Sequence, residues 1–582
     1  MPGCCCGQVR TRFNREGTIL RKVSAPFFKV IALTLTACLI VLNASAQQDR
    51  ENPVLGKDPR LTDGQIAPVL EGLGDHRHNV TTKSDRAQLF FDQGLNMAYA
   101  FNHHEAARSF KEAIRLDPDC AMAYWGLALV TGPNLNLPMQ EGNVASTYEA
   151  IQKAVSLKRK VSEAEQDYID ALATRYTDTY AEDRSALDLA YASAMNNLIA
   201  KYPEDTDALT LYADAMMNTM PWDYWTLDGK PRAGVQGIID ALERVIALDT
   251  NHAGAHHYYI HIVEAHHPER AEASADILAK LMPGAGHIVH MPSHIYVRIG
   301  RYADGSQANI EAAKADEGYI TQCRAQGMYP AHYYPHNVHF IVHSATFEGD
   351  SATAIASAKK VAANAVDKGY TGEDWALHQT FQALPLYTLT RFGKWDEILG
   401  IAEPNEDLTF LRGIWYYARG MALARTDRAS NASDELKKLI DIAQDPTMPE
   451  SLMGFSNAGV VLTIATHTLA GEIAATQKDY DTAISHLSRA VRLEDSMLYN
   501  EPPDWPYPVR HSLGAVLLEA GQHVEAEVVY WDDLRKNPEN GYSLYGVWQC
   551  MKATDNPKAD EIKARLDKAW AGADVMLTGS RF

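Results

Sequence analysis

The chain carries no surplus of basic residues. Of its 582 residues, 54 are Lys or Arg and 74 are Asp or Glu, which gives a formal net charge of −20. Nucleic acids and anionic membrane surfaces are bound by clustered Lys and Arg side chains. We therefore expect neither as the working partner. A hydrophobic content of 46% and an aromatic content of 9% nevertheless indicate a folded globular chain.

Cysteine is also scarce once the first 46 residues are set apart. Four of the seven cysteines lie there, and the remaining three are widely spaced: Cys120, Cys323 and Cys550. Such a set does not make a disulfide framework, so stability must come from packing. Nucleotide-binding glycine motifs, the GxSxG nucleophile motif and CxxC are absent too. Strand signals are nearly absent, so the remaining pattern predicts an all-α fold.

Residues 1–46 have the pattern of a secretory signal peptide. Basic residues precede the apolar run Val30–Leu42, and the small residues Ala44-Ser45-Ala46 mark a cleavage site. We expect a bacterial protein exported to the periplasm or secreted. Lipoprotein processing at Cys38 is disfavoured because apolar residues follow it. Residues 47–86 are expected to be an extended leader segment, and no later apolar stretch is expected to serve as a transmembrane anchor.

Small and aromatic residues recur at fixed offsets along the rest of the chain. The clearest unit is Ala87–Pro118, in which Gly94, Ala106, Phe110 and Ala113 stand at unit positions 8, 20, 24 and 27. Small residues let two antiparallel helices touch, and proline ends the second helix. A second unit, starting at Tyr507, has Gly514, Ala526 and Tyr530 at positions 8, 20 and 24.

These units resemble tetratricopeptide repeats. The block from Tyr99 to Asn136 is also similar to exported bacterial repeat proteins of unassigned activity. The resemblance implies a solenoid of helical hairpins, a right-handed superhelix with a concave groove. We place a histidine-rich part of the solenoid at 87–400 and C-terminal repeats with a cap at 401–582. Such grooves usually bind peptides, which makes a protein-interaction or metal-delivery module the competing function.

Histidine is the residue that is concentrated. Thirteen of the 22 histidines fall between His252 and His343. Six of them form three pairs with i,i+4 spacing: His257 and His261, His290 and His294, and His339 and His343. On a helix, such a pair leaves the same face and can converge on one metal ion. In the repeat frame, all three pairs occupy positions 5 and 9 of a first helix, which the resemblance places in the groove.

The spacing therefore predicts a multi-histidine metal site, with His257, His261, His290, His294, His339 and His343 as ligands. The secondary candidates are His287, His336, His256 and His332. A nitrogen-rich set without thiolates suits copper first, with zinc or iron as alternatives. A histidine groove that binds an acidic peptide, or senses pH, is the alternative to a metal site.

Two functions follow from this metal site. Six histidines can supply three ligands to each of two ions, and a copper pair would make the protein an oxidase or oxygenase for a small molecule or peptide in the groove. Alternatively, Glu264 joins His257 and His261, or acts as the base of a zinc-dependent hydrolase. Arg298, at position 13 of its repeat, is a candidate contact for an anionic substrate. His76 and His78 precede the first repeat and are expected in a solvated leader.

Overall fold

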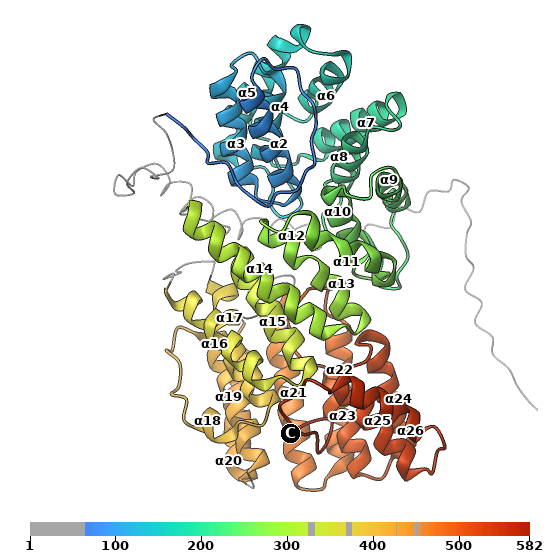
Figure 1. The fold of residues 1–582 in the computed structure, drawn as a ribbon. Coiled ribbons are helices and arrows are strands. Elements are labelled where there is room, and N and C mark those ends of the chain that lie inside the picture. The colour runs from blue at the N-terminus through green and yellow to red at the C-terminus, as the bar shows by residue number, and fades with distance from the viewer. Residues whose placement is uncertain are drawn as a thin grey trace, which may run out of the picture.

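The computed structural model describes residues 64–323, 332–367, 375–426, 428–446, 448, 452–453 and 456–582. The predicted signal peptide lies outside these residues. Within them the chain is almost entirely helical, and the helices pack as successive hairpins (Figure 1). This confirms the predicted all-α solenoid of tetratricopeptide-like hairpins.

The first half of the solenoid, drawn from blue to green in Figure 1, contains twelve described helices. They are α2 (Asp85–Tyr99), α3 (His103–Leu116), α4 (Ala121–Thr131), α5 (Val144–Leu157), α6 (Glu163–Ala173), α7 (Ser185–Lys201), α8 (Thr206–Met217), α9 (Val235–Leu248), α10 (Ala253–Val263), α11 (Glu272–Leu281), α12 (Gly286–His290) and α13 (Pro292–Ile299). Three short 3-10 turns accompany them, at Glu141–Asn143, Lys158–Lys160 and Pro268–Ala271.

The second half runs from green to red in Figure 1. Its helices are α14 (Tyr302–Cys323), α15 (Tyr334–Glu348), α16 (Ser351–Asp367), α17 (Trp375–Arg391), α18 (Trp395–Leu399), α19 (Thr409–Arg425), α20 (Ala429–Ala443), α21 (Ala458–Thr476), α22 (Tyr480–Asp495), α23 (Val509–Glu519), α24 (His523–Lys536), α25 (Gly541–Ala553) and α26 (Ala559–Ala569). One antiparallel pair of two-residue strands, β1 (Leu452–Met453) and β2 (Ser456–Asn457), pairs Leu452 with Asn457.

Hairpins close because glycine meets an aromatic ring, as the repeat pattern predicts. A Cβ atom added to Gly94 or Gly126 would lie 2.8 or 2.4 Å from the Phe110 ring. At the other end of the chain, Gly514 and Gly546 flank the Tyr530 ring, and added Cβ atoms would lie 2.4 and 2.2 Å from it. The same steric device therefore operates in repeats more than 400 residues apart.

Two large hydrophobic cores lie along the solenoid. One joins buried residues from Leu73 to Tyr319, and the other joins buried residues from Ala383 to Leu566. The histidine-bearing helices α10, α12, α13 and α15 lie in the middle of the molecule in Figure 1, where the first half meets the second.

One described helix, α21, is long and apolar enough to pass a length-and-composition test for membrane spans. This result does not overturn the expectation that no later stretch serves as a transmembrane anchor. Most of its apolar window is buried against other helices, which is how the core helix of a repeat satisfies its hydrophobic surface.

Candidate metal centre

Helix α10 brings two histidines to one face and sends a third to the other. All eleven residues of α10 are buried, and His252 caps it by accepting a hydrogen bond at Nδ1 from the backbone of Ala255. His257 and His261 are one turn apart and share a face. His256 points the other way, with Nδ1 2.9 Å from Ser274 Oγ and Nε2 3.0 Å from the Thr250 carbonyl oxygen. This secondary candidate therefore lies outside the site.

His257, His261 and His287 form a group that we call the first trio. One ring nitrogen from each lies within 4.8 Å of the others, and all three side chains are buried. Nε2 of His257 lies 3.1 Å from Nε2 of His287. The Phe101 ring packs against all three imidazoles, with ring centroids 4.4 to 5.6 Å apart. Phe101 thus closes one side of the group with hydrocarbon.

His290, His294 and His336 form the second trio, built in the same way. Their ligand atoms also lie within 4.8 Å of one another, and Nε2 of His290 is 2.9 Å from Nε2 of His294. Here the Phe340 ring packs against all three imidazoles at 4.7 to 5.1 Å. The chain continues from α12 into α13 with Pro292 at the start of α13, so His290 and His294 still meet across that junction.

Backbone and amide acceptors fix the tautomer of one histidine in each trio. Nδ1 of His257 donates to the Tyr99 carbonyl oxygen at 2.6 Å. Asn309 donates from its amide nitrogen to the Gly305 carbonyl, so its Oδ1 faces Nδ1 of His290, 2.6 Å away. In both imidazoles the proton therefore resides on Nδ1, and Nε2 presents a lone pair to the interior of its trio.

Four of the six imidazoles are held neutral. Burial, reinforced by neighbouring imidazoles, sets the pKa of His257, His287, His290 and His336 well below the ordinary value. Neutral imidazole is the form that binds metal. At metal–nitrogen bonds of about 2.0–2.1 Å, two ligand atoms of one ion stand roughly 2.9 to 3.4 Å apart, for right-angled to tetrahedral coordination. The Nε2 pairs, at 3.1 and 2.9 Å, fall in that range.

Two carboxylates lie close to Nδ1 atoms of the imidazoles. Oε2 of Glu264 lies 3.0 Å from Nδ1 of His294, and the same carboxylate lies 3.4 Å from Nδ1 of His261. Glu264 thus touches one histidine of each trio, and its side chain is 3% exposed. Glu501, from the segment after α22, places its Oε2 3.0 Å from the same Nδ1 of His294.

These carboxylates set the charge of the centre. Burial raises the pKa of Glu264, but the charges of His294 and His261 outweigh it and hold this pKa at about 2. Burial lowers the pKa of His294, whereas Glu264 and Glu501 together raise it to about 10. The centre therefore has one imidazole stabilised in its cationic form by two carboxylates, beside several neutral imidazoles.

Two nitrogen atoms of the first trio lack hydrogen-bond partners. Within the described part of the chain, no donor or acceptor pairs with Nε2 of His261 or Nδ1 of His287, although each atom is buried. An unpaired buried polar atom is costly unless a ligand, ion or water satisfies it.

The third predicted pair does not join either trio. The His339 ring lies 6.1 Å from Phe381, and the His343 ring lies 4.8 Å from Phe347. Burial lowers the pKa of His339 to about 3 and that of His343 to about 4. On α15, His336 faces the centre, whereas His339 is rotated about 60° around the helix and His343 lies about 10 Å further along it. His332, just before α15, is also in neither trio.

Sequence reasoning did not single out Phe101, Phe340, Asn309 or Glu501. The secondary candidates His287 and His336 supply the third member of each trio, and both stand at position 2 of their repeats. Considering position 2 of the first helix together with positions 5 and 9 would have identified both residues from the sequence. Glu501 belongs to a proline-rich insertion, where the repeat frame gives no guidance.

A further group of histidines nearby is held by hydrogen bonds to one carboxylate. Asp207, on α8, accepts hydrogen bonds from Tyr99 Oη at 2.6 Å, His78 Nδ1 at 2.8 Å and His76 Nε2 at 2.9 Å, and His252 Nε2 lies 3.3 Å away. Burial raises the pKa of Asp207, but its histidine partners outweigh this and hold it well below the usual value. The expectation of a solvated leader is thus corrected for His76 and His78, because Asp207 ties them to the solenoid.

Comparisons with known proteins find distant structural similarity. No family model and no curated protein matches the chain. The human IFIT1 dimer with m7Gppp-AAAA is 12% identical, over 84% of this chain and 91% of that one, with a TM-score of 0.30. The APC/C hetero-tetramer Cut9–Hcn1 is 13% identical, over 93% and 80%, with a TM-score of 0.26. Naa15/Naa10 bound to HypK-THB is 13% identical, over 83% and 71%, with a TM-score of 0.21.

Proposed function

We propose that the two trios hold a pair of transition-metal ions, copper in preference to zinc or iron, and that the protein is an exported metal-dependent oxidase or oxygenase. One observation carries the proposal: two sets of three imidazoles, five of the six buried, each set packed on one phenylalanine, with Nε2 atoms 3.1 and 2.9 Å apart. A pair of bound copper ions supplies the chemistry that activates oxygen.

The identity of the metal follows from the donors. Imidazole nitrogen suits copper, zinc and iron, whereas calcium and magnesium require oxygen ligands. The carboxylates of Glu264 and Glu501 stand at the Nδ1 side of His294. A carboxylate at that position orients an imidazole and raises its basicity toward a metal at the other nitrogen. Glu264 is therefore proposed as a positioning residue that links the two trios.

A zinc-dependent hydrolase is the second candidate function, and one group of side chains favours it. Glu264, His294 and Glu501 place one ligand atom each within 4.8 Å of one another, all buried. One histidine with two carboxylates suits a single zinc or iron ion. In this case His294 ligates through Nδ1, and only one ion is held there.

Metal content of the purified full-length protein tests the proposal. Elemental analysis is expected to find about two equivalents of metal in the wild type and about one after His257→Ala plus His287→Ala or after His290→Ala plus His336→Ala. His339→Ala and His256→Ala, which alter histidines outside both trios, serve as controls and should keep two. Copper would give visible or electron paramagnetic resonance signals, whereas zinc would be silent.

Equal loss of metal in the trio variants and the controls would contradict the proposal. A metal content that does not change when the trios are substituted would contradict it too. One equivalent of zinc, lost on Glu264→Gln or Glu501→Gln and kept in the His257→Ala plus His287→Ala variant, would establish the second candidate function instead.

A further inference from the structure

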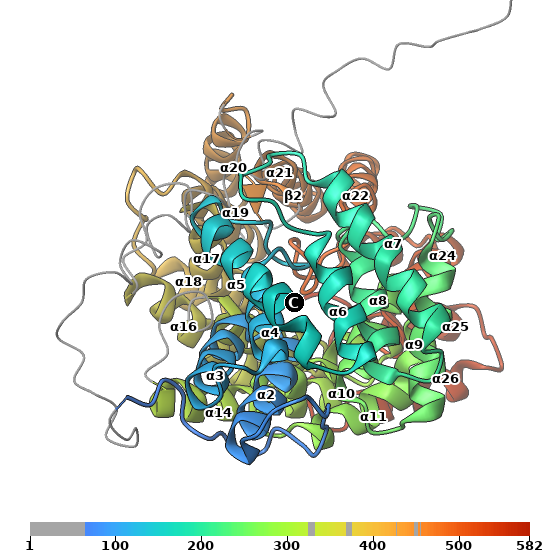
Figure 2. The same ribbon diagram turned by 90° about the horizontal axis from the view of Figure 1, so that it is seen from above.

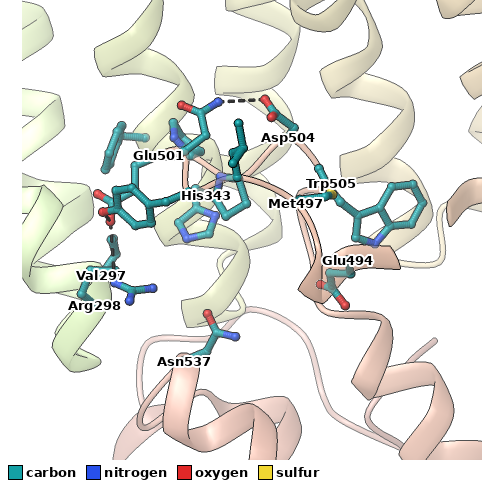
Figure 3. Close-up of a pocket in the computed structure, with 15 residues that line it drawn as sticks. Val297, Arg298, His343, Glu494, Met497, Glu501, Asp504, Trp505 and Asn537 are labelled. Carbon is teal, nitrogen blue, oxygen red and sulfur yellow. Dashed lines mark hydrogen bonds and ion pairs between the residues drawn. The ribbon is translucent and has the colours of Figure 1, made fainter. Parts of the chain in front are cut away.

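A cavity of about 160 Å³ lies beside the second trio. Its walls come from α13, α15 and the end of α22, and from the segment that links α22 to α23 (Figure 3). Glu501 and Arg298 line one side, Trp505 and Glu494 line the other, and His343 lies between them. Phe340, which packs on the second trio, also lines the cavity.

The wall carries more acidic than basic groups. Three carboxyl groups line it, from Glu494, Glu501 and Asp504, against the single guanidinium of Arg298. That guanidinium is already engaged, since it donates to the Ala265 carbonyl oxygen at 3.1 Å and its Nε lies 3.8 Å from Oε1 of Glu501. A ligand that enters the cavity therefore meets an excess of carboxyl groups.

Glu501 already faces the cations of Arg298 and His294, whereas no ion pair among the described residues involves Glu494 or Asp504. Burial raises the pKa of Glu494 to about 8 and that of Asp504 to about 6. His343 does not supply the missing charge, because burial lowers its pKa to about 4. A cation placed between Glu494 and Asp504 would favour their charged forms.

Aromatic rings and an unpaired carboxyl oxygen complete the cavity wall. Trp505 is 2% exposed, and in the described residues Oδ2 of Asp504 has no hydrogen-bond partner. The Tyr499 ring already holds the Arg298 guanidinium, 5.5 Å from its centroid. Aromatic faces attract organic cations, and carboxylates accept the ammonium protons. An anion would instead face three carboxyl groups.

We propose that this cavity binds the ammonium group of a small alkylamine, with Glu494 and Asp504 as its acceptors and Trp505 against its alkyl chain. The inference goes beyond the proposed metal chemistry, because the acceptors belong to neither trio and binding requires no metal.

Calorimetric titration of the full-length protein at pH 7.5 with n-butylammonium chloride and with sodium butyrate tests the inference. Butylammonium is expected to bind with saturation and butyrate not to bind. Glu494→Gln should weaken butylammonium binding about tenfold, as expected for loss of one charged acceptor. Glu494→Gln can still accept the hydrogen bond that the backbone N–H of Val509 donates to Glu494. Glu525→Gln, at an exposed carboxylate on α24, is the matched control and should leave binding unchanged.

Arg298→Gln is expected to change butylammonium affinity in the opposite direction, which damage to the fold cannot produce. Removing the guanidinium removes a like charge, so butylammonium should bind several-fold more tightly. Binding of butyrate alone, failure of both probes, or weaker butylammonium binding in Arg298→Gln would overturn the inference. Binding should persist after treatment with a chelator. Binding that appears only in metal-loaded protein would place the amine on the metal and overturn the inference while supporting the metal proposal.

Discussion

At the scale of single residues, hydrogen bonds behind the imidazoles decide whether the trios can act as ligands. Asn309 is fully buried, and its Oδ1 faces Nδ1 of His290 at 2.6 Å. Asn309→Leu keeps the shape but removes the acceptor, so His290 is free to adopt the other tautomer. We expect metal affinity to fall about 10- to 100-fold, the usual effect of losing such a partner.

Competition with a chromophoric chelator measures this affinity. Gln307→Leu, at an exposed position on the same helix, is the control and should bind metal as the wild type does. An unchanged affinity in Asn309→Leu would show that the tautomer of His290 does not matter for binding.

Glu494 gives a pH dependence of stability that can be assigned to one carboxyl group. Its pKa is raised to about 8 by burial, whereas in the unfolded chain it titrates near 4.5. Between these values the unfolded chain releases the proton and the folded chain keeps it. Stability from this group is therefore complete below about pH 4.5 and falls as pH rises toward 8.

Denaturant unfolding of the wild type and of Glu494→Gln at pH 5 and pH 8 checks the sign. The wild type should lose more stability than the variant over this interval, because Gln does not titrate. A steeper decline in the variant would contradict the assignment. Glu525→Gln, at an exposed carboxylate, should follow the wild type.

At the scale of helices, contact between glycine and an aromatic ring sets how closely hairpins pack. A Cβ atom on Gly126 would lie 2.4 Å from Phe110, between α3 and α4. We expect Gly126→Ala to destabilise the protein by about 1–3 kcal/mol, the usual cost of overpacking a core. Gly318, inside α14, has nothing within 4 Å of an added Cβ atom. Gly318→Ala should stabilise the protein by roughly 0.5–1 kcal/mol, because alanine favours a helix.

Thermal unfolding of the two variants measures both effects, which have opposite signs. A neutral Gly126→Ala would show that α3 and α4 can separate slightly at no cost, and that the repeat pattern reflects something other than this contact.

The repeat pattern predicted the helices well and the site in part, for physical reasons. Offsets of small residues encode which helices touch, so the hairpin of Gly94 and Phe110 could be foreseen. The i,i+4 rule correctly placed His257 beside His261, because both lie on one helix. It also placed His290 beside His294, because the chain stays helical through Met291 from α12 into α13. The rotation of α15 depends on packing between helices, so the position of His336 in a trio, and of His339 outside it, could not follow from spacing alone.

At the scale of the whole molecule, the end of the chain lies among the helices of the second half. Seen from above, the helices surround the C-terminal end (Figure 2). Ser580 is 2% exposed and donates from Oγ to the carbonyl oxygen of His511, on α23. Arg581 is paired with Glu472, on α21, and with Glu519, on α23. The tail thus lies against α21 and α23.

Arg581 is therefore expected to hold the second half together. Glu472 is fully buried, and among the described residues Arg581→Ala would leave its carboxylate with Arg425 alone as an ion-pair partner, 3.9 Å away. Breaking one side of a buried ion pair costs about 3–5 kcal/mol. Adding Glu472→Gln removes the stranded charge and should recover part of that loss. Because the two large cores are separate, hydrogen exchange in Arg581→Ala should rise in α17, α21 and α23 and stay unchanged in α2 to α9.

Uniform acceleration of exchange along the chain would mean instead that the halves unfold as one unit. No rescue by Glu472→Gln would mean that the tail acts through packing of Phe582 rather than through the ion pair. If exchange rises only in the second half and the double variant recovers, the tail is a built-in occupant of the C-terminal hairpins. A ligand that binds between α21 and α23 would then have to displace it.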